Sequence, residues 1–320
     1  MILHNYFTAI NRLHEIFGLV QAGRKCYPQI FSAVLLVTLF SPQCVQARTL
    51  VLVHGFLGNA MNWRTSGFTK PLMYAGWKDG GSYGYTPRGM LLPRYPKITA
   101  DAFYTVNLPS TANLQTQEQL LSRYLTHLFS QRGEPITLVG HSAGGVVARL
   151  YALDPKHIPV NGLITIAAPH LGTPAANIAL IAGNSPLGVM ADFAGGDELR
   201  DARGLFSDLK EERPNTFLYW MNHQPHPDIH YASIIRSNEK ISKVNKFDFI
   251  VPPFSQDMNN IWALQGQSGT AVVTEGHSLN GRDGAIVLEV LDVMKRLQVP
   301  LTAPLQPMAA QKVPIIPVPH

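Results

Sequence analysis

The chain has 320 residues, of which 46% are hydrophobic and 15% are charged, and its formal net charge is +5. A chain of this length and composition can bury a large core in one or two domains, which excludes a disordered or fibrous protein. The positive charge is mild, and no basic run is interleaved with aromatic residues. The composition therefore argues against a nucleic-acid partner.

An apolar block at residues 30–40 follows two basic residues and precedes a short stretch that contains small residues. This order predicts a signal peptide over residues 1–47, with cleavage after Ala47 and export to the periplasm or the medium. The alternative is an uncleaved membrane anchor, because residues 26–47 carry no charge. Both cysteines lie in this leader, so no disulfide is expected in the mature chain.

Short apolar runs alternate with longer stretches along the rest of the chain. Six runs predict strands, at residues 49–55, 103–109, 135–140, 162–169, 230–237 and 269–276. Most of these runs are continuous, which is typical of strands covered on both faces. Apolar residues at helical spacing predict helices over residues 116–129 and 286–297. The alternation predicts an α/β fold with a mainly parallel sheet of about six strands and helices on both faces.

One domain is predicted over residues 48–299, followed by a proline-rich, unstructured tail at 300–320. Residues 56–102 contain a stretch rich in glycine and aromatic residues, which predicts an irregular loop. The connection at residues 171–229 is long and carries an apolar helical pattern, which favours a lid over a binding site. The alternative is a structural excursion that packs on the body of the domain.

The motif GHSAGG at residues 140–145 places Ser142 between a predicted strand and a predicted helix. A sharp strand-to-helix turn exposes a serine on a strained backbone, and flanking glycines remove Cβ atoms that would clash there. The pattern alone is weak, because glycine and serine also suit an ordinary turn. The flanking strand and helix favour Ser142 as a catalytic nucleophile.

A serine nucleophile needs a base within hydrogen-bond reach and a carboxylate that orients this base. His277, in EGHSLN, follows the last predicted strand and precedes the last predicted helix, so it is the predicted base. Two candidates for the carboxylate, Asp248 in FDFIVP and Asp257, follow the strand predicted at residues 230–237.

Attack of a serine on a carbonyl produces an oxyanion, which preorganised N–H donors must stabilise. The first predicted donor is the backbone N–H of Ala143, the residue after the nucleophile. The second is the backbone N–H of Phe56 in HGFLG, which follows the first predicted strand. HGFLG could be an ordinary glycine turn, but the order HG, GxSxG, Asp and His at strand ends favours a catalytic site.

The motifs LVHGFLG, LVGHSAGG, IAAPHLGTP, FDFIVP and EGHSLN together resemble the α/β-hydrolase family, in particular bacterial lipases and esterases, over residues 49–298. The resemblance implies a triad of Ser142, Asp248 and His277 in that chain order, and no organic cofactor. It favours Asp248 over Asp257, because D-x-x-V-P is the pattern of the related enzymes. IAAPHLGTP is similar to the segment that leads into their lid.

The resemblance implies a lipase-like serine carboxylic-ester hydrolase that acts on acyl esters and contacts a lipid interface through the lid. The predicted substrate contacts are Leu57, His141, Leu180, Met190 and Phe193. Other acyl substrates remain open, as in a polyester depolymerase, a thioesterase or an inositol deacylase, because the triad does not select the substrate. A non-catalytic binding protein with this fold is the third hypothesis, and the oligomeric state is not predicted.

No metal site is predicted. Some bacterial lipases bind calcium through an aspartate two positions after the catalytic histidine, where this chain has Leu279. The segment HQPHPDIH at residues 223–230 contains side chains that can bind zinc. Its two prolines break any helix that would align these side chains, so a polar loop is the favoured interpretation.

Overall fold

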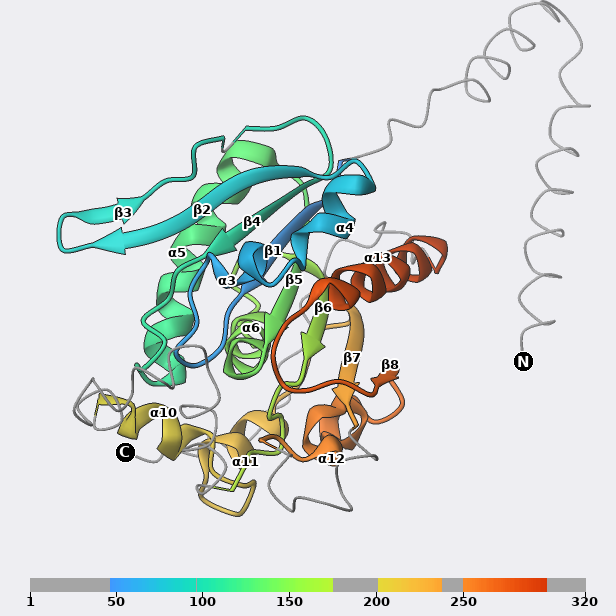
Figure 1. Cartoon of the computed structure of the whole chain (residues 1–320). Coiled ribbons are helices and arrows are strands. Elements are labelled where there is room, and N and C mark those ends of the chain that lie inside the picture. Colours follow the sequence, from blue (N-terminus) through green and yellow to red (C-terminus); the bar gives the residue numbers. More distant parts are fainter. Residues whose placement is uncertain (1–46, 96, 175–200, 238–249, 298–320) are drawn as a thin grey trace, which may run out of the picture. The chain divides into compact units, whose positions relative to one another are not determined.

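The computed structural model describes residues 47–95, 97–174, 201–237 and 250–297. Contacts divide the chain into residues 1–46 and residues 47–320, and the described fold belongs to the second unit. Its centre is one sheet in the order β3-β2-β4-β1-β5-β6-β7-β8 (Figure 1). The strands are β1 Thr49–Val53, β2 Lys78–Thr86, β3 Gly89–Leu91, β4 Ala102–Val106, β5 Ile136–His141, β6 Val160–Ile166, β7 His230–Arg236 and β8 Ser268–Val273.

Every neighbouring pair of strands is parallel except β2 and β3, which form an antiparallel hairpin. Parallel strands need helical crossovers, and these crossovers place helices on both faces of the sheet. The core strands are accordingly buried on both faces: all five residues of β1 and of β4 are buried.

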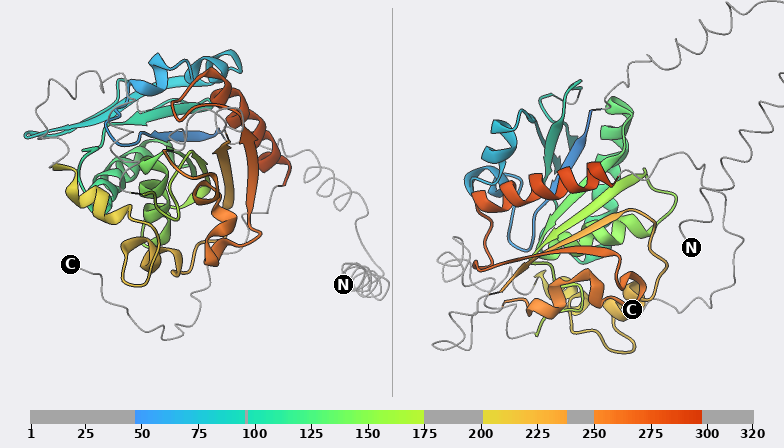
Figure 2. Two further views of the ribbon diagram at one scale, coloured as in Figure 1. Left: turned by 60° about the horizontal axis from the view of Figure 1, so that its bottom comes forward. Right: turned by 90° about the vertical axis from the view of Figure 1, so that its right-hand side faces the viewer.

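The two faces of β1 belong to two separate clusters of buried side chains. Val51 and Val53 pack with the helices α5 (Leu114–Arg132) and α6 (Ala143–Leu153). Leu50 and Leu52 pack against α4 (Thr69–Tyr74) and α13 (Gly281–Arg296) on the opposite face. Figure 2 shows the sheet between these two helical layers. The remaining short helices are α3 Asn62–Thr65, α10 Arg203–Asp208, α11 Phe217–Asn222, α12 Pro253–Gln256 and the 3-10 turns η1 Met258–Asn260 and η2 Trp262–Leu264.

The predicted α/β class and the mainly parallel sheet are confirmed, and each of the six predicted strands is present with slightly different ends. The prediction of an irregular loop over residues 56–102 is wrong, because this stretch contains α3, α4, β2 and β3. The strand β2 was not predicted because it contains several glycines, which have a low strand propensity. Here Gly80 allows close packing, because a Cβ on it would lie 2.1 Å from the ring of Tyr104.

Several sequence predictions concern segments outside the described residues. The leader at residues 1–46, the part of the insertion at 175–200, the segment 238–249 and the tail at 298–320 are among them. The predicted signal peptide, lid and tail therefore stay predictions. Within the described residues, no helix is both long enough and apolar enough to cross a membrane.

Candidate active site

Ser142 lies in a tight turn between β5 and α6 with φ of 53° and ψ of −132°. Residues other than glycine rarely adopt this conformation, and such strained positions persist where the surrounding structure determines them. Two backbone hydrogen bonds hold the turn: Ser142 N–H donates to the carbonyl of Ile166 (2.9 Å), and Gly145 N–H donates to the carbonyl of Ser142 (2.9 Å). The serine is thus fixed at the carboxyl end of the central strands.

Glycines allow three chain segments to meet at this turn. A Cβ on Gly140 would lie 2.4 Å from the Cα of Gly145, and a Cβ on Gly144 would lie 2.2 Å from the carbonyl oxygen of His54. A Cβ on Gly55 would lie 2.8 Å from the Cβ of Ser142. Real Cβ atoms do not approach other atoms this closely, so the packing of β1, β5 and α6 requires glycine at these positions.

The side chains of Ser142 and His277 meet across the end of the sheet. The Oγ of Ser142 lies 3.0 Å from the Nε2 of His277, although the two residues are 135 positions apart. Burial lowers the pKa of His277 well below its ordinary value, and His141 and Arg236 lower it further. The imidazole is therefore neutral at pH 7, and its Nε2 can accept the proton of the Ser142 hydroxyl.

His141 positions the main chain of His277. Its Nε2–H donates a hydrogen bond of 2.8 Å to the carbonyl of His277, and the two rings lie 5.2 Å apart between centroids. Burial lowers the pKa of His141 to about 4, so this ring is neutral as well. The role of His141 as a substrate contact stays a prediction, because its described partner is the backbone of His277.

The loop after β1 brings a second backbone donor next to the turn of Ser142. His54 Nε2 accepts a hydrogen bond of 3.0 Å from Leu108 N–H, so its Nδ1 carries the proton and donates to the carbonyl of Gly55 (2.9 Å). Gly58 N–H donates to the same carbonyl. Phe56 N–H accordingly lies in a fixed loop, and Leu57 takes a φ of 54° there. This contact of His54 was not predicted from the sequence.

Ala143 is the first residue of α6, so its N–H lacks an acceptor within the helix. The positive end of the helix dipole lies at the same place and favours negative charge. Phe56 and Ala143 are both buried. Phe56 follows Gly55, which packs against Ser142, and Ala143 follows Ser142 directly, so both remain the predicted oxyanion donors.

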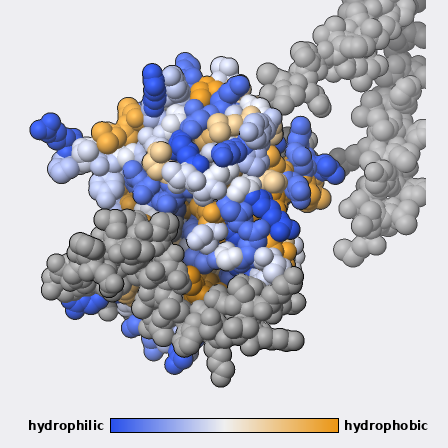
Figure 3. All heavy atoms as spheres, in the orientation of Figure 1, coloured by the Kyte–Doolittle hydropathy of each residue, from blue (hydrophilic) through white to orange (hydrophobic). Residues whose placement is uncertain are grey.

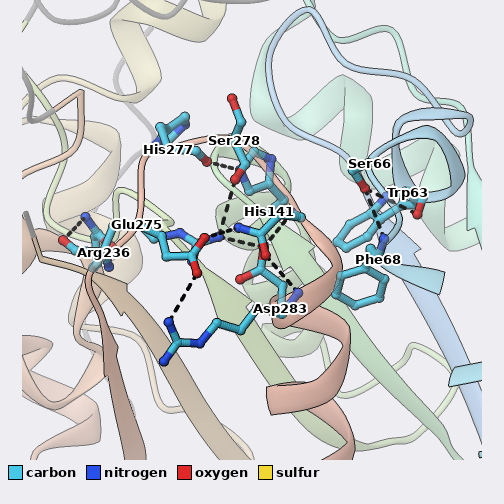
Figure 4. A network of polar contacts seen from close by, with 12 residues as sticks. Trp63, Ser66, Phe68, His141, Arg236, Glu275, His277, Ser278 and Asp283 are labelled. Carbon is cyan, nitrogen blue, oxygen red and sulfur yellow. Dashed lines mark hydrogen bonds and ion pairs between the residues drawn. The ribbon is translucent and has the colours of Figure 1, made fainter. Parts of the chain in front are cut away.

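A buried ion pair lies beneath the segment that carries His277 (Figure 4). Arg236, the last residue of β7, donates from Nη2 to the Oδ2 of Asp283 in the first turn of α13 (2.6 Å). Its Nη2 also lies 3.5 Å from the carbonyl of Ser278. The same carboxylate oxygen accepts from the N–H of Asn280 (2.9 Å). The pair thus connects the segment directly after His277 to the sheet, and no sequence pattern predicts this contact.

The sequence predicts two candidates for the carboxylate that orients His277. Asp248 lies outside the described residues. Asp257 is described, and its Oδ1 accepts hydrogen bonds from the N–H (2.9 Å) and the Nδ2 (3.1 Å) of Asn259. Its described role is therefore to cap η1. Glu275, two residues before His277, contacts Asn280 and Arg282.

Part of the predicted lid insertion covers the loop of Phe56. The ring of Phe206, in α10, lies 5.1 Å from the ring of Phe56 in an edge-to-face arrangement. The Oδ2 of Asp208 accepts from the N–H of Leu114 at the start of α5 (2.8 Å), which fixes α10 on the domain. Of the predicted substrate contacts, Leu57 packs partly buried against the same core. Leu180, Met190 and Phe193 lie outside the described residues.

The histidine-rich segment at residues 223–230 contacts a buried arginine. The Nη1 of Arg149, in α6, lies 3.1 Å from the Nε2 of His226, and its Nη2 lies 2.6 Å from the Oδ1 of Asn222. Burial lowers the pKa of His226 to about 3, with a further effect from Arg149, so this imidazole is a neutral acceptor. Across the described ranges, no three His, Cys, Asp or Glu side chains lie close enough to hold a metal ion.

The parallel sheet, the strained serine turn and the two helical layers define the α/β-hydrolase fold. A family model described as a PGAP1-like alpha/beta domain matches residues 45–181. The fold-level resemblance inferred from the sequence motifs is therefore confirmed.

Solved structures with the same fold share little sequence with this chain. The product of the gene lin2722 of Listeria innocua is 16% identical with a TM-score of 0.54, over 77% of this chain and 94% of that chain. The mature form of the lipase BlEst2 of Bacillus licheniformis is 15% identical with a TM-score of 0.50, over 78% of this chain and 92% of that chain. A comparison with curated proteins finds no match.

The ion pair beneath His277 predicts strong coupling between Arg236 and Asp283. Replacing Asp283 by leucine leaves the buried guanidinium without its carboxylate, so we expect a loss of about 3–5 kcal/mol in the free energy of unfolding. The double variant Asp283→Leu/Arg236→Met removes both charges and should recover part of this loss. Urea unfolding of the wild type, the two single variants Asp283→Leu and Arg236→Met, and the double variant measures the coupling energy. If the losses in the free energy of unfolding of the single variants add up to that of the double variant, the two residues are not coupled.

The environment of His54 predicts a pH-dependent stability. Burial lowers its pKa to about 4, so between pH 6.5 and 5 the unfolded chain binds a proton that the folded chain does not. The free energy of unfolding should therefore fall as the pH falls through this range. The variant His54→Gln cannot bind this proton, and its slope should be shallower by about 1 kcal/mol per pH unit. Equal slopes in urea titrations would show that His54 is protonated in the folded protein.

Proposed function

We propose that the protein is a serine ester hydrolase of lipase-like specificity that cleaves acyl esters through an acyl-enzyme intermediate. The observation that carries the proposal is the 3.0 Å contact between the Oγ of Ser142 and the Nε2 of His277, made by a serine on a strained turn. Ser142 is buried, and a neutral imidazole at hydrogen-bond distance from a serine hydroxyl is the arrangement that activates a serine nucleophile.

In this proposal, His277 removes the proton of Ser142 as the serine oxygen attacks the carbonyl carbon of the ester. The carbonyl oxygen becomes an oxyanion that accepts hydrogen bonds from the N–H groups of Phe56 and Ala143. His277 then gives the proton to the departing alcohol. Water, activated by the same imidazole, attacks the acyl-enzyme and releases the acid and the free serine.

We propose Asp248 as the carboxylate that orients His277. It lies in the segment after β7, and His277 follows β8, the parallel neighbour of β7. Parallel strands place their carboxyl ends at one edge of a sheet, so both segments begin at the same edge. The other candidate, Asp257, has a different described role, because its carboxylate caps η1 through the N–H of Asn259. This also favours Asp248.

The proposed substrate is an ester with an apolar acyl chain. Support comes from the aromatic pair of Phe56 and Phe206, because apolar side chains pack next to the predicted oxyanion donor. A structure with the same fold, BlEst2, is a lipase, and this supports the proposed class of substrate. We also propose export through the leader at residues 1–47, with membrane anchoring by residues 26–47 as the alternative.

The proposed nucleophile predicts that Ser142→Ala nearly abolishes ester hydrolysis. Loss of a triad nucleophile lowers kcat by about a millionfold, because only binding and the oxyanion donors remain. The measurement is the release of p-nitrophenol from p-nitrophenyl butyrate, with circular dichroism as the control for folding. Wild-type turnover by a folded Ser142→Ala protein would exclude Ser142 as the nucleophile.

The proposed carboxylate predicts different effects for two aspartates of the same region. Asp248→Asn should lower kcat by about 10⁴-fold, because the imidazole loses the partner that fixes its tautomer. Asp257→Asn, the matched control, keeps an oxygen that can cap η1, so it should leave kcat within about tenfold of the wild type. The reverse order of the two effects on p-nitrophenyl butyrate hydrolysis would assign the role to Asp257.

A further inference from the structure

The hairpin of β2 and β3 extends beyond the carboxyl ends of the parallel strands, where the candidate active site also lies. Tyr83 of β2 is in register with Val106, the last residue of β4, so residues 84–86 continue past the end of β4. Val106 is in register with Val53 of β1, and Val53 with Gly140, two residues before Ser142. Three residues of strand span about 10 Å, and Figure 1 shows the hairpin projecting from the domain.

Apolar side chains lie exposed on this projection. Tyr85 and Met90 are cross-strand partners on one face of the hairpin, and Leu91, opposite Gly84, points to the other face. Tyr85, Leu91, Leu92 and Tyr95 are 47%, 53%, 52% and 52% exposed. Figure 3 shows hydrophobic and hydrophilic residues side by side on this projection. Exposed apolar groups that gather at one place commonly mark an interaction surface.

The charge on the hairpin has one sign. Residues 80–100 contain Arg88, Arg94 and Lys97 and no acidic residue. All three basic side chains are exposed, and none of them forms an ion pair with another described residue. The acidic residues at either end of this stretch are already paired, Asp79 with Arg64 and Asp101 with Arg48.

The base of the hairpin is anchored, so the exposed side chains have a fixed support. Tyr95 N–H donates to the carbonyl of Gly80 (3.2 Å), and the hydroxyl of Tyr104 donates to the carbonyl of Tyr95 (3.2 Å). Pro93 is buried between these contacts. A rigid projection loses less conformational entropy on binding than a mobile loop.

We propose that the basic hairpin, residues 84–95 with Lys97, docks the protein on an anionic lipid surface. Tyrosine, leucine and methionine side chains enter the headgroup region, while the arginines and the lysine contact lipid phosphates. Tyrosine is favoured at membrane interfaces because its ring is apolar and its hydroxyl is polar. The proposal rests on the proposed function, because it brings lipid esters to the sheet edge that carries Ser142.

The test measures binding of the full chain to sedimented vesicles of phosphatidylcholine with and without 30% phosphatidylglycerol. The charge-reversal variant Arg88→Glu/Arg94→Glu should bind anionic vesicles at least tenfold more weakly than the wild type. The matched control, Lys295→Glu/Arg296→Glu at the end of α13, makes the same change in net charge and should bind like the wild type. All variants carry the same leader, so its contribution cancels.

A second pair of variants tests the apolar contribution. Leu91→Ser/Leu92→Ser should weaken binding to anionic vesicles severalfold. Val293→Ser/Leu297→Ser, which changes exposed apolar residues in and directly after α13, should not. Both hairpin variants should keep the wild-type rate on soluble p-nitrophenyl acetate and lose activity on ester dispersed in the anionic vesicles.

Three outcomes would overturn the docking proposal. They are equal binding to neutral and anionic vesicles, equal loss of binding in the hairpin and α13 variants, or a dimer of this chain that the hairpin variants dissociate. Ser142→Ala should bind vesicles like the wild type. The wild type could hydrolyse no ester while the hairpin variants still bind anionic vesicles more weakly than the wild type. This result would contradict the proposed function and support the docking surface.

Discussion

The close approach of three chain segments around Ser142 is the constraint on which the candidate site depends. The backbone of Ser142 takes a φ of 53° because β5 must turn directly into α6 at the end of the sheet. Gly55 and Gly144 leave room for the loop after β1 to lie against this turn. The same packing therefore joins the turn of Ser142 to the loop that carries Phe56 and to the start of α6 at Ala143.

Buried polar groups fix the other components of the site. Neutral His54 joins the Phe56 loop to the segment after β4, and neutral His141 holds the carbonyl of His277. The ion pair of Arg236 and Asp283 is buried, and it contacts the carbonyl of Ser278 and the N–H of Asn280 in the segment after His277. Removal of one partner from such a buried pair leaves an uncompensated charge and destabilises the fold. In this protein the pair connects the segment after His277 to β7 and α13.

The sequence predicted the parts of the fold whose signal is local. Continuous apolar runs identified six strands, and the glycines around Ser142 identified the turn. The strands β2 and β3 were missed, because their glycines and exposed tyrosine do not follow a strand pattern and their pairing is set by tertiary packing. The pair of Arg236 and Asp283 was also missed because its contact depends on tertiary packing. The two charged residues are 47 positions apart, and no local sequence pattern predicts that they meet.

The central claim is that the contact between Ser142 and His277 forms a reactive nucleophile, and covalent labelling tests it most directly. A fluorophosphonate probe reacts with an activated serine oxygen, which displaces fluoride from phosphorus. We predict that peptide mass spectrometry finds the adduct on Ser142, and that His277→Gln slows labelling by about a thousandfold or more. Absence of an adduct on Ser142 in the folded wild-type protein, or an unchanged labelling rate in His277→Gln, would contradict the account.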